Sequence, residues 1–520
     1  MTAVPTREER PAPAKPRSPL LALLALRILR IEVRHSAFVW AIPLLALLFS
    51  YDPFRTAASY PALWTLRSSV VLDKFWPAYV PFAAGCCAWT GSREGRRDVG
   101  DLLGATARPA WTRQLCSLAG TTAWVLATFL AGVVILYVSI GQAATWGGPP
   151  VGPVVAGVVS LTAVCALAFT LGTLFPARFT APMVAVGMTV LVLAAVSRAV
   201  SQGGVSVASL SPDGLVPQND AGVFYPVAPG VSIVQVIFFA GCALGAAGLL
   251  GLSPRAGGAG WRGALNLASG GGARLRAVAT VVFAAGITLA VIGFGLAATA
   301  KVSSVTGGIE VPALGEASAK PIPYTPVCAE SSGGFQVCLH PAYKGYLSQA
   351  VNAFGPVIAE LSGLPGTPVR AVNVADQTLP VIVQQSANGI VTGNPPSYEF
   401  SMDGAIAQVP DAAQFQDGFR QDIVHAVIVG TSIGQLSASG NVSWNAGTQA
   451  EQAVMDGLLK AIGSQPYPAC SPDGPPCTQQ PQVTAAAARF AALPATTRHA
   501  WLTANLAALA VGHVTLAQVP

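Results

Sequence analysis

The sequence predicts a polytopic α-helical membrane protein with about seven transmembrane helices, followed by a C-terminal α+β extracytoplasmic domain. Two observations about composition lead to this prediction. Apolar residues make up 52% of the 520 residues and charged residues only 10%, whereas a soluble domain usually carries about 25% charge. The apolar excess lies before Lys301, and the sequence after it turns polar. A third observation is that the basic residues of the apolar part gather in every second loop.

Long apolar stretches mark the expected spans. A bilayer core of about 30 Å needs roughly 20 apolar residues in a helix. Stretches of about this length lie near residues 36–52, 75–92, 115–141, 153–175, 180–198, 231–252 and 277–300. We therefore divide the chain into a cytoplasmic tail with an interfacial elbow helix (1–35), a transmembrane domain (36–300), a linker (301–326) and an outer domain (327–520).

Basic residues in short loops predict how the chain is oriented in the cell membrane. Seventeen Lys and Arg residues lie in the N-terminal tail and in every second loop, against four in the opposite loops, which are Arg55, Arg67, Lys74 and Arg198. This bias places the N-terminus in the cytoplasm, and an odd number of spans then places residues 301–520 outside. The net charge of +6 does not indicate nucleic-acid binding, because the positive residues lie beside spans in the lipid bilayer.

Four of the nine cysteines belong to the C-terminal domain, namely Cys328, Cys338, Cys470 and Cys477. An even number in an exported domain predicts disulfides. Of the three possible pairings we favour Cys328–Cys338 and Cys470–Cys477, because each closes a short loop. A zinc site is the alternative, but neither pair has CxxC spacing. We expect no bound metal and no other cofactor.

The apolar part lacks the residues of a transporter that powers itself. No expected span has an acidic or basic residue in its interior, whereas ion-coupled transporters and proton pumps usually need buried ionisable groups. No lysine is followed by Ser or Thr, so the chain has no Walker A phosphate loop. We therefore expect that the chain is not itself an enzyme, and that any ATP-driven activity depends on another subunit.

Residues 18–36 have the spacing of an amphipathic helix. Arg27, Arg30 and Arg34 fall on one face, and leucine and isoleucine side chains fall on another. Such a helix would lie in the membrane interface before the first span. The alternative is that this segment is the cytoplasmic beginning of that span.

The loop between the second and third expected spans mixes charges of both signs with an apolar pair. One interpretation is a solvated basic loop that only sets topology. The other is a short helix that docks onto a cytosolic partner. The candidate docking residues are Arg93, Glu94, Arg96, Arg97, Asp98, Asp101, Leu102, Leu103, Arg108 and Arg113.

Several residues of this loop follow a spaced pattern, which is Glu94, Gly95, Leu102, Leu103, Thr106, Pro109 and Arg113. Together with the elbow helix, the pattern resembles the coupling-helix loop of type-2 ABC transporter permeases. In that family the glycine stands one position further from the glutamate. The resemblance implies contact with a separate ABC ATP-binding subunit, and a homodimer or a heterodimer with a similar permease. The family core has six spans, and the seventh expected here, 277–300, leads into the outer domain.

The outer domain is expected to be a helix-rich α+β fold that is large enough for its own core. Strands are predicted at 335–339, 368–374 and 379–385. Helices are predicted at 341–363, 415–433, 447–463, 483–492 and 495–511.

Residues 420–430 of this domain, RQDIVHAVIVG, resemble the active-site helix of gluzincin-type zinc aminopeptidases. That chemistry needs an H-E-x-x-H motif and a glutamate ligand on the next helix. Only His425 and Glu451 match, because Ala426 replaces the glutamate base and Val429 replaces the second histidine. The resemblance therefore implies a degenerate peptidase domain with no metal, and a working metallopeptidase is the disfavoured alternative.

These observations predict the permease subunit of an ABC-type exporter, powered by a separate ATP-binding subunit and carrying an extracytoplasmic accessory domain. The alternative is a membrane-anchored sensor or binding protein. Its outer domain would capture a peptide or a cell-wall ligand.

Overall fold

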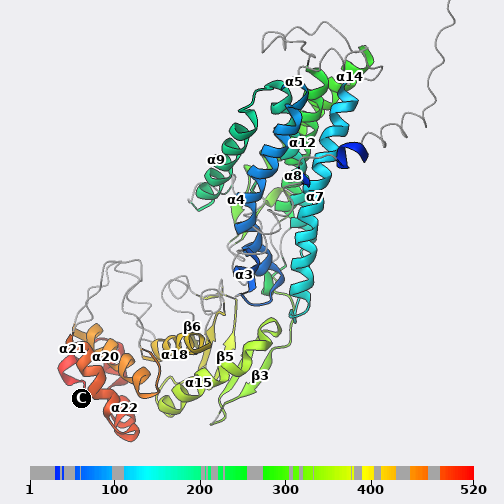
Figure 1. Cartoon of the computed structure of the whole chain (residues 1–520). Coiled ribbons are helices and arrows are strands. Elements are labelled where there is room, and N and C mark those ends of the chain that lie inside the picture. The colour runs from blue at the N-terminus through cyan, green and yellow to red at the C-terminus, as the bar shows by residue number, and fades with distance from the viewer. Residues whose placement is uncertain are drawn as a thin grey trace, which may run out of the picture.

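A bundle of long helices with a mixed domain of strands and helices at one end makes up the structure, a computed structural model (Figure 1). It describes residues 30–34, 38–39, 53–58, 60–96, 110–200, 205, 209–211, 221–226, 229–253, 273–303, 308–315, 320–331, 333–375, 378–379, 389–402, 412–428, 446–465 and 481–520.

Long helices that lie side by side form the bundle (Figure 1). They are α4 (Trp64–Gly91), α7 (Ala110–Gly141), α8 (Val151–Leu174), α9 (Thr180–Val200), α12 (Gly230–Leu252) and α14 (Ala273–Ala297). Short helices lie at their ends, namely α3 (Pro53–Ala58), α5 (Arg93–Arg96) and α11 (Ala221–Phe224).

Four stretches of the described helices are long and apolar enough to cross a membrane, which are Trp111–Gly141, Val151–Leu174, Gly230–Leu252 and Arg276–Ala297. The chain is thus a multi-pass membrane protein, but our prediction of about seven spans was wrong, because the described residues hold about four such helices. Of the expected span 36–52 the structure describes only residues 38–39. Helix α9 covers the expected span 180–198, but its described apolar stretch is shorter, Thr180–Ala195.

Helix α4 covers the expected span 75–92, and its composition explains why it falls short of a lipid-crossing helix. Tryptophan, tyrosine, proline and glycine take the place of many aliphatic residues in it, which lowers its hydropathy. Its side chains are buried inside the bundle instead, with Tyr79 and Val80 each 1% exposed and Ala83 and Ala84 fully buried. A helix that packs against other helices on most of its surface needs no lipid-soluble face.

Glycine lets α4 and α8 approach each other closely. A Cβ atom added at Gly172 would lie 2.2 Å from the carbonyl oxygen of Ala88, and one at Gly91 would lie 2.3 Å from the carbonyl oxygen of Phe169. Helices α12 and α14 meet in the same way, because a Cβ at Gly286 would lie 2.2 Å from the backbone nitrogen of Gly245. Close backbone contact of this kind is how membrane helices gain packing energy without a hydrophobic driving force.

A five-stranded mixed sheet lies at the centre of the C-terminal domain. In spatial order its strands are β3 (Val327–Glu330), β4 (Gln336–Leu339), β5 (Arg370–Asn373), β7 (Ser397–Phe400) and β6 (Gly389–Thr392). The three inner strands are parallel, and β3 and β6 are antiparallel to their neighbours. A short pair of strands, β1 (Lys301–Val302) and β2 (Ile309–Glu310), lies in the segment that we expected to be a linker.

Helices cover this sheet and continue to the C-terminus. They are α15 (Leu347–Leu361), α18 (Ala412–Ile428), α20 (Ala446–Ala461), α21 (Pro481–Ala492) and α22 (Ala495–Ala510). Strands β4 and β5 and these helices confirm the corresponding predictions, except that the predicted helix 341–363 begins with a 3-10 segment, η3 (Pro341–Tyr346). Strands β3, β6 and β7 were not predicted from the sequence. Most of the predicted strand 379–385 lies outside the described residues.

The core of the domain is aromatic. The ring of Phe354 on α15 lies 5.8 Å from that of Tyr398, 5.4 Å from that of Phe400 and 5.3 Å from that of Phe419 on α18. All four side chains are fully buried, and burying each stabilises the fold by about 1.5–3 kcal/mol. This cluster holds both α15 and α18 against the five-stranded sheet.

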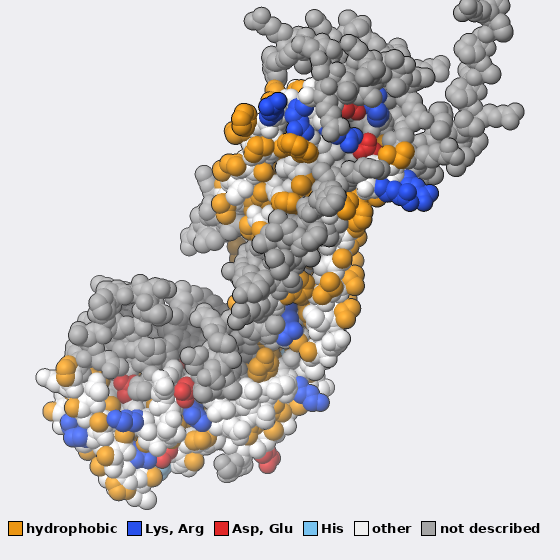
Figure 2. All heavy atoms as spheres, in the orientation of Figure 1, with side chains coloured by type: hydrophobic (Ala, Val, Ile, Leu, Met, Phe, Trp, Pro, Cys, Tyr) orange, Lys and Arg blue, Asp and Glu red, His pale blue; other side chains and the backbone are white. Residues whose placement is uncertain are grey.

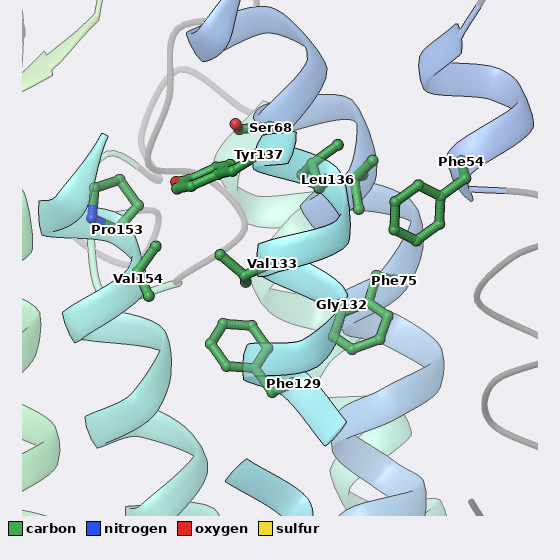
Figure 3. A pocket seen from close by; sticks show the side chains of 11 residues that line it. Phe54, Ser68, Phe75, Phe129, Gly132, Val133, Leu136, Tyr137, Pro153 and Val154 are labelled. Carbon is green, nitrogen blue, oxygen red and sulfur yellow. The ribbon is translucent and has the colours of Figure 1, made fainter. Parts of the chain in front are cut away.

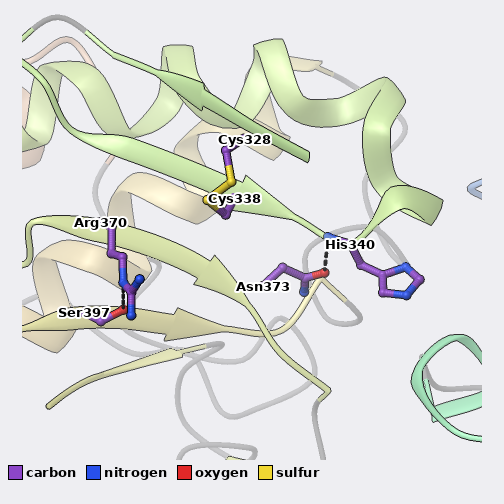
Figure 4. Close-up of a disulfide and its surroundings, with 6 residues drawn as sticks. All are labelled: Cys328, Cys338, His340, Arg370, Asn373 and Ser397. Carbon is purple, nitrogen blue, oxygen red and sulfur yellow. Dashed lines mark hydrogen bonds between the residues drawn. A yellow bond between two sulfur atoms is a disulfide. The ribbon is translucent and has the colours of Figure 1, made fainter. Parts of the chain in front are cut away.

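A disulfide joins Cys328 to Cys338, which confirms one of the predicted pairs. The two residues lie directly opposite each other on antiparallel strands β3 and β4 (Figure 4). The alternative of a zinc site therefore does not hold for this pair. The other predicted pair, Cys470–Cys477, lies outside the described residues.

We expect Gly172→Ala to lower the free energy of unfolding by about 1–3 kcal/mol, because its Cβ would overlap the Ala88 carbonyl and force α4 and α8 apart. Thermal unfolding of the detergent-solubilised protein, followed by circular dichroism, measures the change. Gly187→Ala on α9 is the matched control, since a Cβ there meets no described atom within 4 Å. Equal losses in the two variants would contradict the role of the backbone contact.

Candidate functional site

The predicted docking loop begins at the end of the bundle that lies away from the C-terminal domain (Figure 1). Helix α5 carries Arg93, Glu94 and Arg96, and Arg113 lies in the first turns of α7. Figure 2 shows acidic and basic side chains gathered at this end, with mostly hydrophobic side chains between it and the domain. The remaining candidates lie outside the described residues, and they are Arg97, Asp98, Asp101, Leu102, Leu103 and Arg108.

A bidentate ion pair holds α5 to α7. Arg113 donates from Nε to Oε1 of Glu94 at 2.9 Å and from Nη2 to Oε2 at 3.1 Å. The side chains are 17% and 30% exposed, so water only partly screens the pair. Paired contacts of this kind between Arg and a carboxylate give both energy and a defined orientation. The structure therefore brings together two of the predicted loop residues that are 19 positions apart.

A second ion pair ties α5 to the elbow segment. Residues 30–34 are helical, and Glu32 in this segment accepts a hydrogen bond from Nη2 of Arg93 at 2.9 Å. The other carboxylate oxygen of Glu32 accepts a weaker bond, at 3.4 Å, from the hydroxyl of Ser117 on α7. Glu32 was not among the candidate residues predicted from the sequence. Its signal was present, since it is the one acidic residue in the expected elbow helix 18–36.

The elbow segment itself packs onto the middle of α7. The indole Nε1 of Trp124 donates to the carbonyl oxygen of Val33 at 2.6 Å. A Cβ at Gly120 would lie 3.0 Å from the Cβ of Glu32, so a small residue is needed where the two segments cross. Residues 30–34 are therefore fixed by α7 as well as by Arg93.

Two further contacts complete the surroundings of α5. A Cβ at Gly95 would lie 2.4 Å from the Cβ of Pro176, so only glycine lets α5 rest against the segment that follows α8. The guanidinium carbon of Arg96 lies 3.6 Å from the ring centroid of Trp89, within the range of a cation–π interaction. Trp89 and Pro176 were not identified from the sequence.

Together, Glu32, Arg93, Glu94, Gly95 and Arg113 make a charged platform, which we define as α5 with the groups that hold it. The platform connects the elbow segment, α4, α7 and the segment between α8 and α9. Nη1 of Arg113 is buried and has no hydrogen-bond partner within the described ranges. The platform is built to hold α5 in one position at the membrane surface, rather than to bind a small molecule.

A second cluster joins the C-terminal domain to the bundle around His340, which is fully buried. Its ring lies 4.8 Å from that of Trp146 after α7, 4.8 Å from that of Phe224 on α11 and 4.2 Å from that of Tyr324. Its backbone N–H donates to Oδ1 of Asn373 at 3.3 Å, and its ring points away from the sheet (Figure 4). The domain is therefore packed against loops of the bundle through aromatic rings.

Hydrogen bonds orient the His340 ring and its surroundings. Nδ1 accepts from the backbone N–H of Ala342 at 3.2 Å, so a proton on the neutral ring resides on Nε2. Nε2 is buried with no hydrogen-bond partner among the described residues. Burial lowers the pKa of His340 to about 4. The junction is closed by two more bonds, from Thr145 Oγ1 to the carbonyl oxygen of Pro341 and from the N–H of Ile322 to the carbonyl oxygen of Phe224.

The two peptidase-like positions lie on separate helices. His425 is on α18 and Glu451 is on α20. Burial lowers the pKa of His425 and raises the pKa of Glu451 to about 7. Within the described part of the chain, no three His, Cys, Asp or Glu side chains are grouped so that they could hold a metal ion.

Comparisons with known proteins add no relative. No protein family, no curated protein and no solved structure matches this chain. The interpretation of the platform and of the junction therefore rests on their own geometry.

We expect acid to loosen the junction through His340. The free ring takes up a proton below about pH 6.5, whereas the buried ring stays neutral down to about pH 4. The contribution of the neutral ring to the free energy of unfolding is fully present above pH 6.5. As the pH falls towards 4, this contribution is lost, and the free energy of unfolding decreases by on the order of 3 kcal/mol. Chemical denaturation of the purified protein at pH 7, 5.5 and 4 measures this loss.

His340→Phe is the control for this titration, because it keeps an aromatic ring at the junction and removes the ionisable group. Between pH 7 and pH 4 the wild type should lose about 3 kcal/mol more unfolding free energy than the variant. A difference in unfolding free energy between wild type and variant that stays constant from pH 7 to pH 4 would show that His340 takes up its proton over the same pH range in the folded and unfolded states.

Proposed function

We propose that this chain is the membrane-spanning permease subunit of an ABC-type exporter, with the C-terminal domain as an extracytoplasmic accessory domain. A separate ATP-binding subunit would power it, because the sequence has no Walker A phosphate loop. The single observation that carries the proposal is the charged platform. It is a short helix between two bundle helices, held from three sides at the basic end of the bundle.

The platform suits the transfer of motion from a partner. A partner that pushes on α5 moves α7 through the Glu94–Arg113 pair and moves the elbow segment through the Glu32–Arg93 pair. Both pairs are only partly exposed to water, so separating their charges costs free energy. A displacement of α5 would therefore be passed to these helices, rather than absorbed by broken contacts.

Three observations support a cytoplasmic platform and an extracytoplasmic domain. The number of spans does not by itself decide on which side of the membrane the domain lies. An even number of spans would place the domain on the same side as the N-terminus. However, the apolar stretch Arg276–Ala297 leads from the platform end of the bundle directly to the domain at Lys301 (Figure 1). Arg93, Arg96 and Arg113 lie at the platform end, as the positive-inside rule requires of a cytoplasmic end. The disulfide Cys328–Cys338 suits the oxidising side.

The same proposal includes a second permease subunit, either a copy of this chain or a similar one. Helix α9 supports it, because much of its apolar surface is uncovered within one chain. Phe179 just before it is 76% exposed, and Met183 and Leu191 are 68% and 64% exposed. Lipid or the partner permease would cover this surface in the membrane.

We expect an ATP-binding protein to co-purify with the tagged full-length chain from membranes of its native host in mild detergent. Glu94→Arg should reduce the recovered amount about tenfold, because it places like charges 2.9 Å apart and displaces α5. Quantitative mass spectrometry of the eluates measures the ratio of ATP-binding protein to permease.

Two variants control this experiment. Glu330→Lys on exposed strand β3 changes charge far from the platform and should leave recovery unchanged. The double exchange Glu94→Arg with Arg113→Glu restores an ion pair and should recover most of the binding. If wild type yields no ATP-binding protein, the permease proposal fails. Tight binding of a peptide or cell-wall fragment by the same preparation would then favour the sensor or binding-protein alternative.

A further inference from the structure

An apolar groove opens between three bundle helices on the side of the membrane next to the C-terminal domain (Figure 3). Its walls come from α4, α7 and α8, and Phe54 on α3 closes one end. Phe75, Phe129 and Leu136 form much of its surface. Its empty space, counted together with the open mouth, is about 460 Å³.

Among the described residues, the groove offers a ligand no charge and no free side-chain hydrogen-bond donor. Ser68 and Tyr137 are its only polar side chains among the described residues, and both hydroxyls are already engaged. Ser68 Oγ donates to the carbonyl oxygen of Trp64 at 2.5 Å, and Tyr137 donates to that of Pro150 at 2.9 Å. A polar ligand would lose its hydration without replacement, which costs free energy. The apolar lining of the groove therefore favours a hydrocarbon ligand.

The groove lies at the depth of lipid chains. On α7 it runs from Phe129 to Tyr137, which is about 12 Å along the helix axis. It stops four residues, or about 6 Å, before α7 ends at Gly141. Since the stretch Trp111–Gly141 is apolar enough to cross a membrane, this position corresponds to the hydrocarbon layer below the lipid headgroups.

The groove is also continuous with surface that faces lipid. Phe54, Val133 and Val154 in its walls are only half-buried, so the groove is not sealed. Next to them on α7, Val134 is 60% exposed and Ile135 is 61% exposed. A lipid that lies against this face of α7 can turn one chain into the groove without leaving the bilayer.

From this geometry we infer that the groove binds one acyl chain of a bilayer phospholipid, in the leaflet next to the C-terminal domain. The bound chain fills space between α4, α7 and α8 that their own side chains leave open. Since the chain is in hydrocarbon before and after it binds, the gain is van der Waals packing against these three helices. This inference does not depend on the transport proposal, because it uses only the bundle and its depth in the membrane.

The test uses the full-length protein in nanodiscs that contain a phospholipid with a photoreactive diazirine on one acyl chain. After illumination, mass spectrometry of the peptides locates the label. We expect labelling of groove residues on α4, α7 and α8, and we expect about one phospholipid per chain to survive extensive detergent washing.

Gly132→Leu fills the groove, because Gly132 lines it and a Cβ there meets no described atom within 4 Å. The substitution should lower groove labelling and retained phospholipid at least fivefold. Gly187→Leu on α9 is the matched control, since that position is equally open but lies outside the groove, and it should change neither quantity. Thermal unfolding of both variants checks that the bundle remains folded.

Three results would overturn the inference. One is groove labelling that is unchanged in Gly132→Leu. Another is label confined to outward-facing residues such as Val134 and Ile135, which means that lipid only surrounds the helix. The third is labelling by a free fatty acid that carries the same diazirine but not by the phospholipid, which would assign the groove to a different ligand.

Discussion

The backbone contact between α4 and α8 positions both ends of the molecule. Because Gly172 has no side chain, the carbonyl of Ala88 can lie against it. This contact fixes the position of α4 along the axis of the bundle. The last turn of α4 leads directly into α5, so the same contact determines where Glu94 meets Arg113. At the other end of α4, Leu63 and Leu66 join the buried cluster that includes the core of the C-terminal domain.

This arrangement makes α4 a shared element of two regions that differ in chemistry. Charge and hydrogen bonds hold the platform end, where Glu32 and Arg93 meet across 61 positions of sequence. Aromatic packing around His340 holds the domain end, where no ion pair is found among the described contacts of that ring. A charged contact suits a surface that a soluble partner can reach. A dry aromatic contact suits a permanent attachment between two parts of one chain.

Local patterns predicted the parts of this structure that depend on near neighbours. Cys328 and Cys338 are separated by one hairpin, so their pairing could be inferred from spacing. The alternation of 335–339 and the helical spacing of 495–511 were sufficient for β4 and α22. The span count was too high in part because residues 75–92 were counted as a span, although the tryptophan, tyrosine, proline and glycine residues of α4 lower its hydropathy. Whether its aromatic and proline-rich sequence faces lipid or other helices depends on what packs around it.

The sequence by itself determined that the chain is a multi-pass membrane protein, that its basic residues gather at one end, and that its C-terminal domain contains a local disulfide. These properties follow from composition and short-range spacing. Only the tertiary structure decided the partners of Glu94 and Arg93, the burial of His340 and the open groove beside Gly132. Each depends on how closely distant helices approach, which is set by side-chain volume and packing rather than by any local pattern.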